Sequence, residues 1–93
     1  MSMENANTFV KKLFGDDEFI KEFYKNGGIK KDGSDKEKND TMINTANKMG
    51  YDIDEQEFKK ATEDYFAKKG TWGTIKTFMH FNKVIKSAEK EGK

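Results

Sequence analysis

His80 is the only histidine in this chain of 93 residues, and there is no cysteine. The two side chains that titrate closest to neutral pH, histidine and cysteine, are therefore almost absent. A histidine works as a catalyst beside a partner nucleophile or base, and it holds a metal only together with further ligands. No motif supplies such partners, so we interpret His80 as a surface or boundary residue of a helix. The lack of cysteine also excludes a disulfide and a thiolate metal site.

The 17 acidic residues offer two other kinds of chemistry, calcium binding and acid catalysis. The stretch that ends at Glu57 resembles the exit of a calcium-binding EF-hand loop. The loop positions that should be acidic, acidic or amide, and glycine then hold Ala46, Lys48 and Tyr51, so the calcium interpretation fails. The remaining acidic residues are interspersed with lysine at helix-face spacings, which is typical of a solvated surface. We therefore predict no catalytic, metal-binding or cofactor-binding residue and a protein that is not an enzyme.

Two glycine-containing stretches resemble functional motifs. Gly27-Gly28 has the form of the double-glycine processing site of secreted peptides, but the preceding positions that should be apolar hold Asp17, Glu22 and Lys25. We interpret the pair as a helix terminator instead. The stretch Gly70-Thr-Trp-Gly matches neither a Walker loop nor a Rossmann loop, so no phosphate-binding loop is predicted.

The composition predicts one small domain with a modest core. Charged residues make up 38% of the chain and apolar residues only 33%, a balance that leans towards disorder. Eight Phe, three Tyr and one Trp counter it, because each such side chain contributes about 1.5–3 kcal/mol when buried. No apolar run approaches the roughly 20 residues of a membrane span, and the N-terminus lacks the pattern of a secretory signal, so we expect a cytoplasmic protein.

The net charge of +1 is distributed unevenly. Residues 1–66 hold 11 Lys and 15 acidic residues, a net charge of −4, whereas residues 67–93 hold 7 Lys and 2 acidic residues, a net charge of +5. All 18 basic residues are Lys. Because Arg supplies the forked contacts of most sequence-specific DNA-binding proteins, we predict no specific nucleic-acid partner.

Apolar residues recur at helical spacing, and no alternating stretch is long enough for a strand. The sequence predicts an all-α fold, a small bundle of four to five short amphipathic helices. A first helix begins at a cap at Ser2 and runs to about Phe14, and a second begins at Asp16 or Asp17. A third helix is expected to begin at Asp40.

The junction between the third and fourth helices carries the strongest local signals. Gly50 is suited to end the third helix, and Asp54 is suited to cap the fourth. Glu57 stands at the capping-box position, and Ile53 and Phe58 stand at the two positions of a hydrophobic staple. Four independent signals thus agree on this junction.

The C-terminal part predicts a fifth helix. Gly70 ends the fourth helix, and Thr71 or Thr74 caps a fifth that runs from about residue 75 to 88. Its core-facing stripe is expected to consist of Ile75, Phe78, Met79, Phe81, Val84, Ile85 and Ala88.

Two units follow from this order of elements. Residues 1–70 form a helical domain with a flexible loop at 27–39, which we interpret as a solvated insertion rather than a binding loop. Residues 71–93 form a cationic amphipathic helix, which we expect to pack on that domain and complete its core.

The order of these elements resembles the Nif-eleven type of nitrogen-fixation-associated leader-peptide family. The resemblance covers about residues 1–66, and it rests on Phe9-Val-Lys-Lys-Leu, Asp16-Asp-Glu-Phe-Ile-Lys-Glu, Ile43-Asn-Thr-Ala-Asn-Lys-Met-Gly and Gly50-Tyr-Asp-Ile-Asp-Glu-Gln-Glu-Phe. It implies a helical leader that binds a maturation enzyme, followed by a core peptide that is modified and cut off. The chain departs from the family in its longer 27–39 loop and in lacking a Gly-Gly or Gly-Ala pair between Phe66 and Trp72.

Two functions remain open at this point. One is a leader or precursor of ribosomally synthesised modified peptides. The other is a protein–protein interaction module that is never processed. In either case the partner is another protein, with weak association of the last helix with an anionic membrane as a further option. The candidate partner-binding residues are Trp72, Lys76, Phe78, Phe81 and Lys83.

Overall fold

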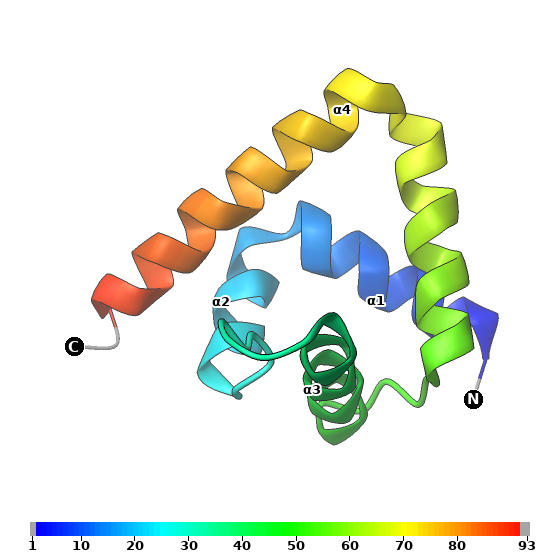
Figure 1. Cartoon of the computed structure of the whole chain (residues 1–93), viewed down its shortest axis with the longest axis horizontal. Helices are drawn as coiled ribbons and strands as arrows, with labels where there is room; N and C mark the ends of the chain where they lie inside the picture. The colour runs from blue at the N-terminus through cyan, green and yellow to red at the C-terminus, as the bar shows by residue number, and fades with distance from the viewer. Residues whose placement is uncertain (1, 92–93) are drawn as a thin grey trace.

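The computed structural model describes residues 2–91, which form four α-helices: α1 (Met3–Gly15), α2 (Asp17–Lys25), α3 (Asp35–Lys48) and α4 (Glu55–Glu91). The prediction of an all-α fold is confirmed. Figure 1 shows α4 as a bent outer frame, with α1, α2 and α3 on its inner side. The packing of α1 and α2 against α4 therefore organises the molecule.

Short polar side chains fix where the helices begin. Ser2 accepts from the backbone N–H of Asn5 at 3.0 Å, and Asp16 accepts from that of Phe19 at 3.2 Å. At α4 the caps are reciprocal: Asp54 accepts from the N–H of Glu57 at 2.8 Å, and Glu57 accepts from the N–H of Asp54 at 3.1 Å. The predicted starts of the first, second and fourth helices are therefore confirmed.

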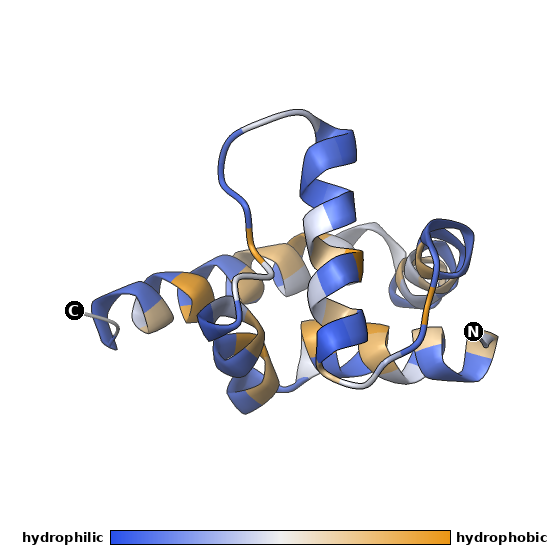
Figure 2. Cartoon of the chain, turned by 90° about the horizontal axis from the view of Figure 1, so that it is seen from below, coloured by the Kyte–Doolittle hydropathy of each residue, from blue (hydrophilic) through white to orange (hydrophobic). Residues whose placement is uncertain are grey.

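The predicted start of the third helix at Asp40 is wrong, because α3 begins earlier, at Asp35. The Ser34 hydroxyl accepts from the N–H of Glu37, and the Glu37 carboxylate accepts from the N–H of Ser34, each at 3.2 Å. This second capping box extends the helix through residues that were expected to be loop. The predicted loop at 27–39 thus shortens to residues 27–34, which we call the polar arch and which Figure 2 shows beside α3.

The glycine pair ends α2, in agreement with its interpretation as a helix terminator. Gly27 has a φ of 83°, and its N–H donates to the carbonyl of Tyr24 while the N–H of Gly28 donates to that of Phe23. These two bonds form a Schellman motif. A Cβ at Gly28 would lie 2.4 Å from the ring of Phe23, which is fully buried. Gly27 therefore supplies the positive φ angle, and Gly28 allows the backbone to approach the ring of Phe23 closely.

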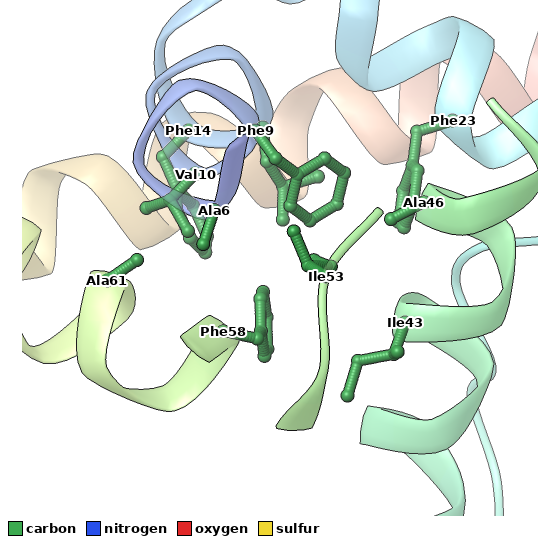
Figure 3. Packing of buried hydrophobic residues seen from close by; sticks show 11 residues of the cluster. Ala6, Phe9, Val10, Phe14, Phe23, Ile43, Ala46, Ile53, Phe58 and Ala61 are labelled. Atoms are coloured by element: carbon green, nitrogen blue, oxygen red, sulfur yellow. The ribbon is translucent and has the colours of Figure 1, made fainter. Parts of the chain in front are cut away.

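Phe9 is the centre of the main core. It is fully buried, and its ring centroid lies 5.4 Å from that of Phe23, 5.6 Å from that of Tyr51 and 6.0 Å from that of Phe58. Figure 3 shows Ile53 and Phe58 pointing into the same cluster, as the predicted hydrophobic staple requires. One residue of α1 thereby contacts residues from α2, from the segment after α3 and from α4.

α4 consists of two arms that meet at Gly70. Gly70 has φ 74° and ψ −179°, a non-helical conformation that glycine adopts readily and other residues rarely do. We call residues 55–69 the first arm and residues 71–91 the second arm. Gly70 was predicted to end the fourth helix; the structure has a kink at this residue, and α4 continues beyond it to Glu91. The predicted caps at Thr71 and Thr74 are wrong, because the second arm follows Gly70 directly and the Thr74 hydroxyl donates to the carbonyl of Gly70 at 2.7 Å.

The end of the second arm packs on α2. Val84 and Ile85 form a small cluster with Ile20, and Ile29 and Phe81 lie between this cluster and the main core. In the described part of the segment 71–93, which was expected to pack on the domain, Val84, Ile85 and Ala88 are buried. The predicted core-facing stripe is wrong at Ile75 and Met79, which are 44% and 58% exposed, and only partly right at Phe78, which is 45% exposed.

Candidate interaction surface on the second arm of α4

The outer face of the second arm combines exposed apolar side chains with lysine. The name outer face refers to five exposed residues: Trp72, Ile75, Lys76, Met79 and Lys83. Trp72 is the most exposed of the large apolar residues, at 76%. Residues 72, 76, 79 and 83 are spaced by four, three and four positions, so they lie along one side of the helix.

Phe78 and Phe81 lie on a different side of the same arm. The ring of Phe78 stacks on that of Phe66, with centroids 5.0 Å apart, and meets the edge of Phe14 at 5.9 Å. Phe81 is half-buried, with its ring centroid 5.4 Å from that of Phe14. The structure therefore divides the five predicted partner-binding residues: Trp72, Lys76 and Lys83 share the outer face, whereas Phe78 and Phe81 face the two arms' common interior.

These inward contacts hold the outer face in place. Phe66 belongs to the first arm and Phe14 to the end of α1, so the Phe66, Phe14 and Phe78 rings form a wedge inside the bend. The Thr74 hydroxyl also donates a hydrogen bond to the carbonyl of Gly70, at the kink. Because these ring contacts tie the inner side to α1 and to the first arm, the outer side chains project from a supported helix rather than from a free one.

The charged residues of the outer face itself are lysines, and Asp17 of α2 lies at its edge, beside His80. The sequence contains no acidic residue between Asp64 and Glu89. The described residues include no ion pair for Lys76, Lys83 or Lys86. The surface therefore presents unpaired ammonium groups beside exposed apolar side chains.

The acidic residues at the end of the arm are used elsewhere. Glu91 pairs with Lys21 of α2 at 2.8 Å, and Glu89 pairs with Lys31 of the polar arch. The hydrogen bond and the charge of Lys21 lower the pKa of Glu91 below its ordinary value, and the same pairing raises the pKa of Lys21. These carboxylates thus help attach the arm to the domain instead of neutralising its outer lysines.

His80 lies at the edge of this arm, where its Nε2 is 2.6 Å from the Asp17 carboxylate. Both side chains are more than half exposed, so the interpretation of His80 as a surface residue is confirmed. Among residues 2–91 no group of three His, Asp or Glu side chains is arranged to hold a metal ion. In the same part of the chain, no helix is both long and apolar enough to cross a membrane.

Ile75 and Met79 are members of the outer face that the sequence prediction placed in the core. The signal that identifies them is the neighbouring charge, because Met79 stands three residues after Lys76 and four before Lys83. A helix side that carries lysine at these spacings is a solvated side. Apolar spacing alone does not distinguish it from the buried side.

No protein-family model matches this chain, and neither the curated proteins nor the solved structures include a significant match.

Proposed function

We propose that this small helical bundle is a non-catalytic interaction module that binds an acidic, amphipathic segment of another protein through the outer face. The observation that carries the proposal is the exposure of Trp72, at 76%, beside Ile75 and Met79 on a helix whose opposite side contacts α1 and the first arm. Contiguous exposed apolar groups commonly mark interaction sites, and Trp is enriched among interface hot spots.

The charge pattern supports an acidic partner. A surface whose own charged residues are lysines attracts a negatively charged segment and repels a basic one. The apolar side chains add the area that such a contact needs to persist at physiological salt, where exposed charges alone are screened over about 8 Å. A helix with carboxylates on its flanks and an apolar centre has both features.

Site-specific photo-crosslinking in the cell that makes the protein tests this proposal. A benzophenone side chain at position 72 is expected to form an adduct with one protein. The double variant Ile75→Glu and Met79→Glu is expected to remove the adduct, since it opposes both the apolar and the electrostatic contact. The same probe at Lys48, an exposed residue of α3, is the control. An adduct no stronger at 72 than at 48, or one that contains only lipid, contradicts the proposal.

A leader or precursor function is the second candidate. It is favoured by the resemblance over about residues 1–66 and by the exposure of Lys68, Lys69 and Gly70 at the kink, where a protease would have access. The burial of Val84, Ile85 and Ala88 favours the unprocessed module instead, because removal of residues 71–93 would uncover Ile20 and part of the core. Intact-mass measurement of the protein from its native cell distinguishes the two: a species cut near Gly70 supports the precursor, and an unmodified full-length chain supports the module.

A further inference from the structure

A second surface feature lies inside the bend of α4. A groove of about 300 Å³ is bounded by α1, the polar arch, the first half of α3 and both arms of α4. Its apolar lining includes Phe14, Met42, Phe58, Phe78 and Phe81. Its volume is at the lower end of the range for small-molecule sites, about 300–1,000 Å³, so it is large enough for one small ligand.

Two lysines give the groove a positive margin. Lys30 of the polar arch and Lys38 of α3 both line it, and neither forms an ion pair within the described part of the chain. Glu37, the neighbour of Lys38 in sequence, also lies near Lys30: the hydrogen bonds from Ser34 and the charge of Lys30 lower the pKa of Glu37. Because no ion pair within the described part of the chain holds Lys30 or Lys38, both ammonium groups can still approach an external anion.

We propose that this groove binds a medium-chain fatty acid, with the acyl chain against the phenylalanine rings and the carboxylate between Lys30 and Lys38. The apolar lining accounts for the chain, because removing methylene groups from water contributes about 0.8 kcal/mol for each group buried. The charge complementarity accounts for the head group, since an ammonium–carboxylate hydrogen bond is stronger than one between neutral groups. Asn39 and Thr62 are further polar residues of the lining.

The methionines allow this site to be observed separately from the outer face. Met42 lines the groove, whereas Met79 is 58% exposed on the outer face and Met3 is 36% exposed on α1. In protein labelled with ¹³C at the methionine methyl groups, decanoate is expected to shift the Met42 signal in a saturable, one-to-one titration. The Met3 and Met79 signals are expected to stay in place.

Two comparisons identify the role of the lysines. The double variant Lys30→Gln and Lys38→Gln is expected to weaken decanoate binding by about tenfold while leaving the binding of decanol unchanged, because only the carboxylate needs the charges. The matched control, Lys11→Gln with Lys48→Gln, removes the same net charge from exposed positions outside the groove and is expected to have no effect. Circular dichroism checks that each variant is folded.

The proposal is overturned if decanoate shifts Met79 together with Met42 or if the titration does not saturate, because both describe partitioning of an amphiphile onto any apolar surface. It is also overturned if the Lys30 and Lys38 variant binds decanoate as well as the unaltered protein does. These outcomes are independent of the photo-crosslinking at position 72, so the groove and the outer face can fail separately.

Discussion

The two arms of α4 have similar apolar content but bury it differently. In the first arm, Phe58 and Ala61 are buried, and Tyr65 and Phe66 are half-buried on the same side. In the second arm burial begins only at Val84, and the large apolar residues between Trp72 and Met79 are exposed. Apolar spacing therefore predicts that both arms are helical, while the packing surface that α1 and α2 offer decides which apolar residues are covered.

The largest expected effect comes from truncating one phenylalanine in each arm and comparing the losses of stability. Phe58→Ala is expected to lower the free energy of unfolding by about 3–5 kcal/mol, because Phe58 is 7% exposed and contacts the ring of Phe9. Phe78→Ala is expected to cost about 1–2 kcal/mol, since Phe78 is 45% exposed. Urea unfolding of both variants measures the two values. Equal losses would mean that the second arm is as deeply packed as the first.

The kink that separates the arms is the next target. Gly70→Ala is expected to destabilise the protein by about 1–3 kcal/mol, because a side chain disfavours the observed backbone angles. An added Cβ would meet no atom within 4 Å, so the cost is conformational rather than a clash. Lys68→Ala, two residues before the kink, is the control and is expected to change stability by less than about 0.5 kcal/mol, because Lys68 is exposed. A Gly70→Ala variant as stable as the control would show that the bend is not fixed by this residue.

The entries to the two arms differ in their caps. Asp54→Ala removes one half of a capping box at the first arm and is expected to cost about 1 kcal/mol. Thr71→Ala, at the start of the second arm, is expected to stay within about 0.5 kcal/mol, because the second arm follows Gly70 without a cap from Thr71. Thermal unfolding of both variants provides the measurement, and a larger loss from Thr71→Ala would contradict the assignment.

The smallest expected effect concerns pH. Because Lys21 lowers the pKa of Glu91 in the folded protein, this pair stabilises the end of the second arm above the ordinary pKa of glutamate, and the contribution is lost as the pH falls through the lowered value. The raised pKa of Lys21 means that the same contribution is lost again in strongly alkaline solution. NMR signals of Ala88 are expected to change on acidification before those of the first arm. In Glu91→Gln this early change should disappear; its persistence would assign it to another group.

The sequence predicted most of the fold because its signals are local. Ser2, Asp16 and Asp54 act on backbone groups within one turn, and Gly27 and Gly50 end helices through their own backbone angles. The start of α3 was missed because Asp40 and Ser34 are both good caps and the stretch between them holds no apolar residue. The Ser34–Glu37 pair is the signal that decides between them.

The candidate surfaces were only partly predictable. Trp72, Lys76 and Lys83 were selected as partner-binding residues by type, and they do share one helix side. The inward position of Phe81 and the groove near Met42 depend on side chains that are distant in sequence, from α1, α3 and both arms. Helical spacing describes each helix by itself, so it cannot predict a groove that forms between several helices.

The attachment of the second arm also has a consequence for the order of folding. Its contacts join residues that are far apart in the sequence: His80 and Asp17 are separated by 63 positions, and Lys31 and Glu89 by 58. Closing a long loop of the chain costs conformational entropy before the contact that stabilises it has formed. The helix caps and the junction around Gly50 form between residues that are close in sequence, so this cost is small there. We therefore expect the second arm to dock last and to open first, as a separate cooperative unit that amide hydrogen exchange would detect.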